Sequence, residues 1–253
     1  MEMKYLIIGC LFVLIIVGIL FIMRNANKDS KGEKEPKKTK DIDINQLLKY
    51  HYYINLDYRT DKNKKNIEEL KKIGIYNPNR FSAIKKDNGV VGCYMSHIEV
   101  LKLARKKKWP YVTVFEDDVL FLKPEDTLKK LNRIINSNIK WDVIILGGQN
   151  GPPYEEINSD CIKVSNCQST TSYLVKQSYY DTLINHWEKG LDLLIKTNDR
   201  PLYAIDIYWK ILQKKDNFLA IIPMDVIQYP GYSDIDKMEV DWTEQLIDYK
   251  TAF

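Results

Sequence analysis

The sequence predicts an α/β fold in which helices cover both faces of a central sheet. Segments typical of strands and of helices alternate along most of the 253 residues, which is the pattern of proteins built on parallel or mixed sheets. The candidate strands are continuously apolar, as in "YVTVF" (111–115), and this pattern is typical of strands buried on both faces. The acidic residues that follow this strand would lie at its carboxyl end, where such sheets bind ligands.

Residues 5–23, "YLIIGCLFVLIIVGILFIM", are apolar and carry no charge. As a helix they would extend about 28 Å, close to the thickness of the hydrocarbon core of a bilayer. We therefore predict a single transmembrane anchor after a short flank, residues 1–4. A cleaved signal peptide is the alternative. The apolar part of such peptides usually has about 7–15 residues, however, and no small-residue cleavage site follows here.

Residues 24–47 are polar, rich in lysine and free of aromatic side chains. Such a segment cannot bury enough apolar area to offset the entropy of ordering, so we expect a flexible stalk. Its excess of Lys and Arg beside the anchor favours a cytosolic location for the domain that follows. That domain, residues 48–253, has a net charge of only +2, which argues against nucleic acid as its main partner.

The first part of this domain predicts a strand, a helix and a second strand. "HYYINL" (51–56) is aromatic and apolar, and a charged turn follows it. Residues 61–75 place apolar side chains on one stripe of a helix. "RFSAI" (80–84) is a short second strand.

The next helix is expected to begin near Ser96. Ser96 and Glu99 have the spacing of a capping box, in which each side chain bonds the backbone N–H of the other residue. The basic run 105–108 ends this helix, where the helix dipole favours cations. After the strand 111–115, Pro124 begins a helix over 124–135, because proline suits the first helical turn.

The second half of the domain continues the alternation. Three apolar segments predict buried strands at 141–146, 172–175 and 218–222, the first of which ends at a pair of glycines. Helices are expected between them, near 177–188 and 202–213.

Three acids in a row, Glu116, Asp117 and Asp118, end the strand 111–115. Two neighbouring carboxylates about 5 Å apart repel each other by roughly 3 kcal/mol at an effective dielectric constant near 20. The acids are therefore either a solvated turn or neighbours of a cation. In an extended segment Glu116 and Asp118 would point to one side and Asp117 to the other. Two oxygen ligands on one side would suit a hard divalent ion such as Mg²⁺ or Mn²⁺.

No other catalytic motif competes with the acids. The sequence has no GxxxxGK[ST], GxGxxG, HExxH or GxSxG motif and no paired CxxC. The three histidines, His51, His97 and His186, are scattered along the chain, which argues against a zinc site built from histidines.

Over residues 51–235 the sequence resembles glycosyltransferase family 25, the group that contains lipooligosaccharide glycosyltransferases and procollagen galactosyltransferases. The motif "GCxxSH" (92–97), followed about 20 residues later by "EDD" (116–118), is the specific part of the resemblance. The stretches that corroborate it, in order, are "YYINLDYRTDK", "RFSAI", "WDVIILG", "SYLV", "LYAIDIYW" and "QYPGYSDI".

The resemblance implies a GT-A-like nucleotide-sugar fold and inverting transfer of a hexose, commonly galactose, from a UDP-sugar donor to a hydroxyl of a glycan or protein. It implies a divalent metal, with Mn²⁺ favoured and Mg²⁺ the alternative, held by Glu116, Asp117 and Asp118. It also implies a lumenal domain, in conflict with the charge bias, so the side of the membrane stays open. The residues that match the family's donor-binding stretches are Asn55, Asp57, Arg59, Gly92, Cys93, Ser96, His97, Gln228, Ser233 and Asp234.

One position departs from the family pattern. Lys62 stands where many members carry a second arginine. Lysine keeps the positive charge but lacks the planar fork that binds a phosphate through two hydrogen bonds, so the nucleotide contact expected there is in doubt.

Inverting transfer needs a base to take the proton of the acceptor hydroxyl. Asp206 is our candidate, because its apolar and aromatic neighbours would raise the pKa of its carboxyl group. A capping or ion-pairing role on its helix is the alternative. Tyr203, Tyr208 and Trp209 offer faces for sugar stacking, or they belong to the core.

Two other functions stay open at this point. The chain could be an inactive relative that displays a carbohydrate- or partner-binding face. It could also be a metal-dependent phosphohydrolase, because clustered acids also hold two-metal sites.

Overall fold

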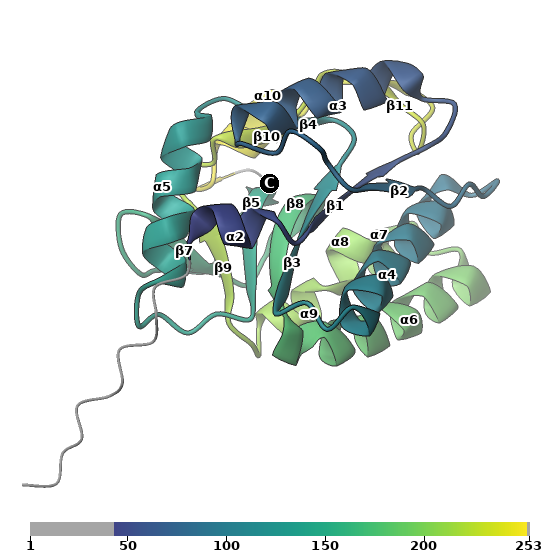
Figure 1. Cartoon of the computed structure of the whole chain (residues 1–253). Helices are drawn as coiled ribbons and strands as arrows, with labels where there is room; N and C mark the ends of the chain where they lie inside the picture. The colour runs from purple at the N-terminus through teal and green to yellow at the C-terminus, as the bar shows by residue number, and fades with distance from the viewer. Residues whose placement is uncertain (1–42, 252–253) are drawn as a thin grey trace, which may run out of the picture. The chain divides into compact units, whose positions relative to one another are not determined.

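The computed structural model describes residues 43–251, and within them the centre is a mixed sheet of eight strands (Figure 1). The strand order is β2-β1-β3-β8-β5-β9-β7-β6. Parallel pairing joins β1 to β2 and β3, and β5 to β9, whereas the other neighbours in the sheet are antiparallel. The strands are β1 (His51–Asn55), β2 (Arg80–Ser82), β3 (Tyr111–Glu116), β5 (Val143–Asn150), β6 (Tyr154–Glu156), β7 (Cys161–Val164), β8 (Cys167–Lys176) and β9 (Phe218–Ile221).

Helices cover both faces of this sheet, as predicted (Figure 1). One buried apolar cluster joins one face of the sheet to α4 (Gly89–Lys106), α6 (Tyr180–Thr197), α8 (Ile205–Tyr208) and α9 (Lys210–Gln213). A second cluster joins the other face to α2 (Ile44–Leu48), α3 (Thr60–Lys72) and α5 (Pro124–Ile135). The remaining short helices are the 3-10 turn η1 (Gln177–Tyr179), α7 (Arg200–Tyr203) and α10 (Thr243–Ile247).

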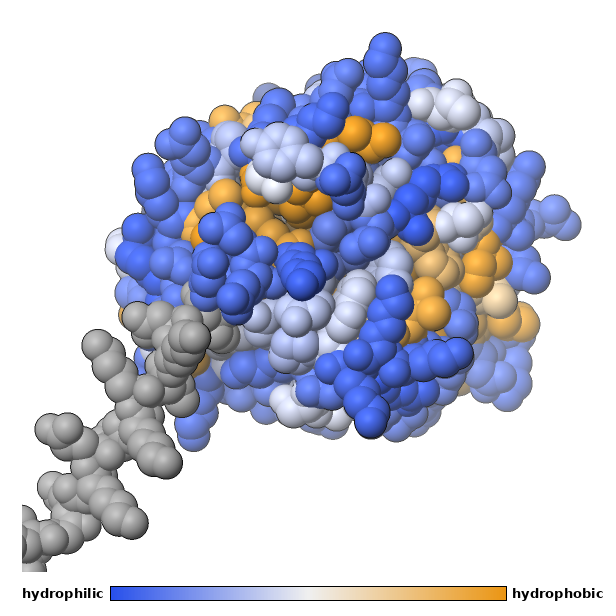
Figure 2. All heavy atoms as spheres, viewed as in Figure 1, coloured by the Kyte–Doolittle hydropathy of each residue, from blue (hydrophilic) through white to orange (hydrophobic). Residues whose placement is uncertain are grey.

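Strand β5 shows why the strands are continuously apolar. Val143 and Ile145 belong to the first cluster, whereas Ile144 and Leu146 belong to the second. Successive side chains of a strand point to opposite faces, and both faces are buried here. On the side of the molecule shown in Figure 2, hydrophilic residues dominate the surface and apolar residues gather in separate patches.

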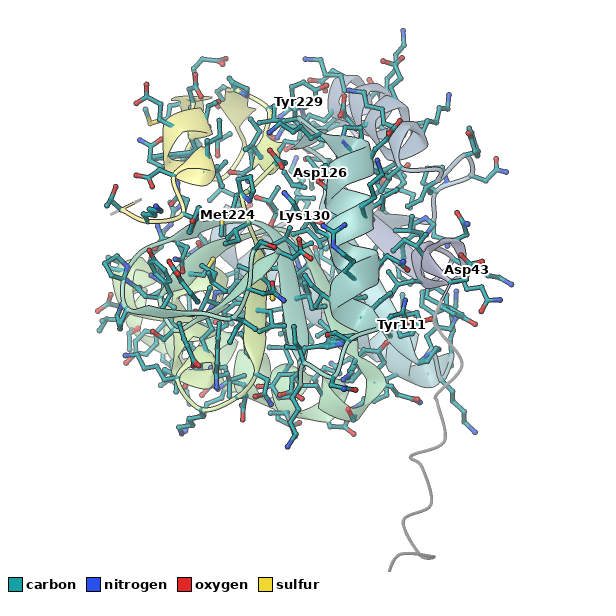
Figure 3. The ribbon with its side chains drawn as sticks, turned by 90° about the vertical axis from the view of Figure 1, so that its left-hand side faces the viewer. Asp43, Tyr111, Asp126, Lys130, Met224 and Tyr229 are labelled. Atoms are coloured by element: carbon teal, nitrogen blue, oxygen red, sulfur yellow. The ribbon has the colours of Figure 1, made fainter. Side chains whose placement is uncertain are left out.

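Two small antiparallel pairs bring the C-terminal part of the chain beside β3. β4 (Val119–Phe121) pairs with β10 (Val226–Gln228), and Gln228 lies opposite Val119. β11 (Gly231–Ser233) pairs with β12 (Met238–Val240). The segment before β10 is fixed by Lys130 of α5, labelled in Figure 3, whose ammonium lies 3.3 Å from Asp225 and 2.7 Å from Asp126.

Most predicted elements are confirmed, and the helix over 124–135 has the predicted bounds. The predicted start of α4 at Ser96 is wrong. The helix begins at Gly89, and the side chain of Asn88 caps it by accepting a hydrogen bond from the N–H of Val90 at 3.1 Å. Ser96 lies inside the helix and is buried, so its hydroxyl serves a tertiary contact rather than a cap.

Two further predictions differ in detail. β5 does not end at its glycines but continues to Asn150, with register shifts against β8 at Gly147. The helix predicted over 202–213 is divided into the short helices α7, α8 and α9. The break between α7 and α8 lies at Ala204, which is extended, with ψ of 148°.

The folded unit begins earlier than predicted. Residues 44–47 were expected in the stalk, but Ile44–Leu48 form helix α2, which Asp43 caps. Leu47 and Leu48 are buried against the second apolar cluster, and this burial favours order over a flexible stalk. The described residues belong to one compact unit, Ile42–Phe253.

The predicted anchor, residues 5–23, and the stalk up to residue 42 lie outside the described residues. Among residues 43–251, no helix combines the length and the apolar character needed to cross a bilayer.

Candidate functional site

A cavity of about 810 Å³ opens beyond the end of β3 and between α4, β8, α8 and the C-terminal strands. It brings together the three acids and most of the other predicted site residues. The predicted residues that line it are Gly92, Cys93, Ser96, His97, Glu116, Asp117, Asp118, Asp206, Gln228, Ser233 and Asp234. Asn55, Asp57 and Arg59 are not part of its lining.

The three acids do not alternate as an extended segment would. Strand β3 ends at Glu116, and Asp117 and Asp118 form a turn before β4. The backbone carbonyl of Asp118 accepts a hydrogen bond of 2.7 Å from the N–H of Tyr229, which holds this turn against the C-terminal segment. The prediction that Glu116 and Asp118 share one side is therefore wrong: Asp117 and Asp118 share a partner, and Glu116 has others.

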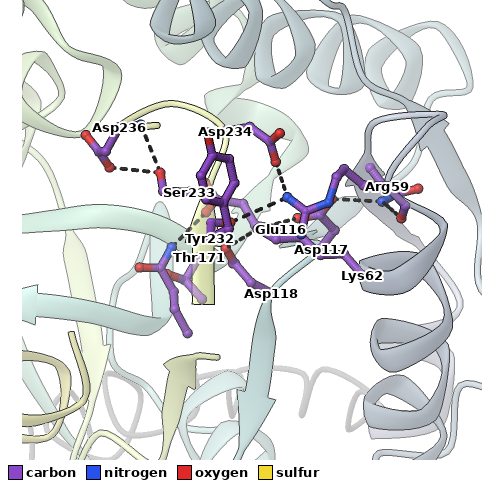
Figure 4. A network of polar contacts seen from close by, with 12 residues as sticks. Arg59, Lys62, Glu116, Asp117, Asp118, Thr171, Tyr232, Ser233, Asp234 and Asp236 are labelled. Atoms are coloured by element: carbon purple, nitrogen blue, oxygen red, sulfur yellow. Dashed lines mark hydrogen bonds and ion pairs between the residues drawn. The ribbon is translucent and has the colours of Figure 1, made fainter. Parts of the chain in front are cut away.

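The cation beside the acids is a side chain of the protein itself. The ammonium of Lys62, from α3, lies 3.1 Å from Asp118 Oδ2 and 3.5 Å from Asp117 Oδ1 (Figure 4). The amide of Asn55 also donates to Asp117 Oδ2 at 2.8 Å. The repulsion expected within the run of acids is thus relieved for this pair by one charge and one amide.

The carboxylate of Glu116 contacts a different set of polar groups. Its Oε1 accepts a hydrogen bond of 2.6 Å from Thr170 Oγ1 and lies 3.3 Å from His97 Nε2. Its Oε2 accepts from the amide of Gln228 at 3.2 Å. Residues from α4, β8 and β10 therefore meet at this one carboxylate.

These environments move the pKa values of the acids in opposite directions. Burial raises the pKa of Asp118 to about 6, with Lys62 opposing the shift and Glu116 adding to it. Burial likewise raises the pKa of Asp117 against the effect of Lys62. Burial would also raise the pKa of Glu116, but the hydrogen bond and charge of His97 outweigh it and lower the pKa. The sharpest contrast is between Glu116, whose pKa is lowered, and Asp118, whose pKa is raised to about 6.

The three acids carry ligand types suited to a hard divalent ion, although the possible metal ligands that meet within 4.8 Å of one another among residues 43–251 are Cys93, His97 and Glu116. Asp118 Oδ1 is buried and has no hydrogen-bond partner among the described residues, and a buried oxygen without a partner is costly unless something binds it. Glu116, Asp117 and Asp118 together offer the carboxylate oxygens that Mn²⁺ and Mg²⁺ prefer. Such an ion would compete with Lys62 for Asp117 and Asp118.

Two of the predicted donor-binding residues, Asn55 and Asp57, lie outside the lining of the cavity. Asn55 is buried and holds Asp117, and its amide also donates to the carbonyl of Arg59 at 3.1 Å. Asp57 is exposed and accepts hydrogen bonds of 2.7 Å from Arg80 and Ser82 of β2. Neither residue faces the cavity, so the role predicted for them as direct contacts has no support in this geometry.

Arg59 fastens the C-terminal segment to the start of α3. Its guanidinium binds Asp61 and makes a short ion pair with Asp234 (Figure 4). Its NH1 group also donates to the carbonyl of Tyr232 at 3.4 Å. The hydroxyl of Tyr58 adds a hydrogen bond of 3.0 Å to Asp234. These contacts hold the loop after β11 over the cavity.

The same segment is held at a second point. Arg200 of α7 lies 2.7 Å from Asp236. The hydroxyl of Ser233 donates to Asp236 at 2.9 Å (Figure 4). The C-terminal segment is therefore attached both to Arg59 at the start of α3 and to α7, and both helices contribute residues to the lining of the cavity.

The first turns of α4 form the floor beside the acids. A Cβ added at Gly92 would lie 2.4 Å from the carbonyl oxygen of Ile84, so only glycine permits this approach. Ser96 reinforces it, because its hydroxyl donates to the carbonyl of Gly92 at 2.7 Å and accepts from the N–H of Ile84 at 2.8 Å. The "GCxxSH" motif thus fixes the loop before α4 and turns Cys93 and His97 toward Glu116.

Asp206, the predicted base, lies at the start of α8 and lines the cavity. Its Oδ2 accepts a hydrogen bond of 3.0 Å from the N–H of Ser169 in β8. Ser169 has a left-handed backbone with φ of 71°, a conformation that costs a non-glycine residue about 1 kcal/mol or more. Burial raises the pKa of Asp206, as the sequence argument expected.

The aromatic residues near Asp206 do not reach the cavity. Tyr208 and Trp209 are buried in the first apolar cluster, and Tyr203 packs against it. Sequence reasoning missed Thr170, which contacts Glu116, and Arg200, which lines the cavity, because neither belongs to a motif and only the fold brings them to the site. It did single out Lys62, as a departure from the family pattern.

The family comparison agrees with these observations. The family model described as "Glycosyltransferase family 25 (LPS biosynthesis protein)" matches residues 57–197. A curated protein of Rattus norvegicus, described as "Probable inactive glycosyltransferase 25 family member 3", is 35% identical over 74 residues. This match covers 27% of the chain and 12% of the rat protein, so the chain spans a small part of that relative.

The chain also shows weak similarity to two solved structures of glycosyltransferases. One is involved in the glycosylation of the major capsid of PBCV-1; it is 12% identical, with a TM-score of 0.44, over 74% of this chain and 95% of that one. The other is a mutant of Drosophila β-1,4-galactosyltransferase 7 in complex with manganese, UDP-Gal and xylobiose. It is 8% identical, with a TM-score of 0.31, over 53% of this chain and 51% of that one.

Proposed function

The chain belongs to glycosyltransferase family 25, and we propose that it transfers a hexose, with galactose favoured, from a UDP-sugar to a hydroxyl of a glycan or protein. The transfer inverts the anomeric centre and depends on a divalent metal, with Mn²⁺ favoured over Mg²⁺. The observation that carries the proposal is one cavity that gathers all three acids, the "GCxxSH" helix and the C-terminal segment, with Asp118 Oδ1 lacking a partner.

Glu116, Asp117 and Asp118 would hold the metal. When bound, the ion supplies positive charge to the diphosphate of the donor as that group leaves. Lys62 and Arg200 add positive charge from α3 and α7 at the wall of the same cavity. The volume of about 810 Å³ is within the range of about 300–1,000 Å³ found for small-molecule sites.

We assign Asp206 as the base. It is a separate group from the metal-binding acids, so its oxygens are not needed for the ion. The N–H of Ser169 occupies Oδ2, which leaves Oδ1 for an acceptor hydroxyl. A raised pKa makes a carboxylate a better proton acceptor, and a positioned base contributes about 10²–10⁴-fold to the rate.

The experiment is a screen of UDP-sugars with Mn²⁺ in which released UDP is measured with and without glycan acceptors. Asp118→Asn should abolish metal-dependent turnover, and Asp206→Asn should lower the rate of transfer by about 10²–10⁴-fold. Asp192→Asn, on the exposed face of α6, is the matched control and should retain full activity. Unchanged turnover in Asp118→Asn would contradict the proposal.

A binding function is the second candidate, favoured by the description of the rat relative as probably inactive. Calorimetry that detects glycan binding but no binding of UDP-sugar or Mn²⁺ would support it over catalysis. Release of inorganic phosphate from nucleotides would instead indicate the phosphohydrolase alternative.

The proposal includes the membrane anchor at residues 5–23, for which the support is the uncharged apolar segment itself. Protease protection in intact vesicles tests on which side of the membrane the catalytic domain lies. Protection indicates a lumenal domain, as the family resemblance implies, whereas digestion indicates the cytosolic side that the lysines and arginines favour.

A further inference from the structure

Cys93, His97 and Glu116 form a cluster of mixed chemistry at the edge of the cavity. Cys93 Sγ, a ring nitrogen of His97 and a carboxylate oxygen of Glu116 all lie within 4.8 Å of one another. We propose that these three side chains form a second metal site, separate from the Asp117–Asp118 pair, for a borderline-soft ion such as Zn²⁺.

The geometry suits a tetrahedral ion. Cys93 and His97 are four residues apart on α4, so their side chains lie on the same face of the helix. Zinc bonds of about 2.0–2.3 Å place tetrahedral ligand atoms about 3.3–3.6 Å apart. His97 Nε2 already lies 3.3 Å from Glu116 Oε1. The sulfur, which lies within 4.8 Å of the other two ligand atoms, would therefore have to move closer by at most about 1.5 Å.

The ligand types select the ion. A thiolate and an imidazole favour zinc and similar transition metals, whereas Mg²⁺ and Mn²⁺ prefer oxygen ligands alone. With Cys93 as a thiolate and Glu116 ionised, the two negative charges balance one Zn²⁺. The thiol proton leaves for solvent as the metal–sulfur bond forms. All three residues line the cavity, so a water molecule in the cavity would take the fourth coordination position of the ion.

Tyr173 prepares His97 for this role. The Tyr173 hydroxyl lies 2.8 Å from His97 Nδ1, and Tyr173 is fully buried. A metal-binding histidine usually uses its other ring nitrogen for such a bond, which fixes the ring and its tautomer. With Nδ1–H donating to Tyr173, the lone pair of Nε2 would bind the ion, in place of the hydrogen bond that Nε2–H makes to Glu116 without metal. The scattered histidines argued against a zinc site built from histidines, but this site needs only one histidine.

The consequence for catalysis rests on the proposed function. Glu116 would be shared between the two metal sites, and an ion on Cys93 and His97 would draw Glu116 away from Thr170 and Gln228. Zn²⁺ should therefore inhibit a Mn²⁺-dependent transferase reversibly, and a chelator should restore the activity.

The binding test uses Co²⁺ as a spectroscopic substitute for Zn²⁺ on the full chain, and it needs no turnover. One equivalent of Co²⁺ should give a thiolate-to-cobalt charge-transfer band and the strong visible bands of a tetrahedral site, and Zn²⁺ should remove both. Cys93→Ala should lose the charge-transfer band, and Ala suits the helix. Cys161→Ala, which removes a buried thiol outside the cavity, is the matched control and should keep it.

A second variant tests the role of Tyr173. Tyr173→Phe should keep the bands but weaken Zn²⁺ binding about 10–100-fold, as loss of an outer hydrogen bond does. Absence of the charge-transfer band in the wild-type protein, or an equal band in Cys93→Ala, would overturn the proposal. If the cobalt spectrum is as expected but no UDP-sugar is turned over, the proposed function fails while the metal site stands.

Discussion

Replacement of Lys62 by methionine tests whether its ammonium is the cation that holds the acids together. The ammonium lies 3.1 Å from Asp118 and 3.5 Å from Asp117. At an effective dielectric constant near 20, each contact is worth about 5 kcal/mol of attraction, most of which offsets the cost of removing the charges from water. Methionine keeps an unbranched stem and removes the charge.

The expected loss of stability follows from the burial of the three side chains. Breaking a buried ion pair by removing one partner costs about 3–5 kcal/mol. The side chains here are 14–20% exposed, so water relieves part of the cost, and we expect a loss of about 2–4 kcal/mol. For a slope near 2 kcal/mol per M, the urea midpoint should fall by about 1–2 M in metal-free buffer.

The same assay with Mn²⁺ tests whether Lys62 and the metal compete for the acids. An ion present at 100 times its Kd stabilises the folded state by about 2.7 kcal/mol. Because Lys62 no longer competes for the acids in Lys62→Met, Mn²⁺ should raise the midpoint of this variant more than that of the wild type. Lys64→Met, an exposed lysine of the same helix, is the control. Equal stability of Lys62→Met and the wild type without metal would refute the role of Lys62.

Two further predictions concern the scaffold around the site. His51 is buried, with Nδ1 2.6 Å from the carbonyl of Leu48 and Nε2 accepting from the N–H of Asn79 at 2.9 Å. Burial lowers the pKa of His51, so the folded state binds fewer protons than the unfolded chain. The stability present above pH ~6.5 should therefore fall as the pH drops, by up to about 1.4 kcal/mol per pH unit. Chemical denaturation of His51→Gln should show a flatter pH dependence between about pH 6.5 and 5.5; an unchanged slope would exclude His51 as its source. Gly92→Ala should lose about 1–3 kcal/mol in the same assay, because its Cβ would lie 2.4 Å from Ile84 O. A gain in stability, as expected from helix propensity alone, would contradict this close contact.

Local signals were enough to predict the strongest elements of the fold. Pro124 and the acids after it define the start of α5 without help from the rest of the chain. The apolar run of β5 predicted burial on both faces, and its residues divide between the two buried clusters. These elements were predictable because their sequence patterns agree with their final surroundings.

The errors arise where contacts between segments that are far apart in the sequence determine the local structure. The spacing of Ser96 and Glu99 matches a capping box, but the hydroxyl of Ser96 is used by the N–H of Ile84 inside the fold. Strands β4 and β10 have three residues each and pair across more than 100 positions. Segments so short show no periodicity from which to predict them.

The candidate site was predicted only in part, because contacts between distant segments also determine its geometry. The run of acids identified the edge of the sheet where the cavity lies. The turn at Asp117 and Asp118 was not predicted, and because of it these two acids share a partner. The charge of Lys62 could be read from the sequence, whereas its place between two acids follows from how α3 packs against β4. Asn55 and Arg59 fit a motif, yet they act through Asp117 and Asp234 rather than at the cavity wall.

The central claim is that the acids at the end of β3 bind a divalent ion that holds the diphosphate of a sugar donor. Anomalous diffraction from a crystal soaked with Mn²⁺ and UDP-galactose tests it most directly. We predict a manganese peak within coordination distance of Asp118 Oδ1, with the diphosphate bound to the same ion and Lys62 displaced from the acids. A nucleotide bound in the cavity with no peak at the acids, and with Lys62 still paired to Asp117 and Asp118, would contradict the claim.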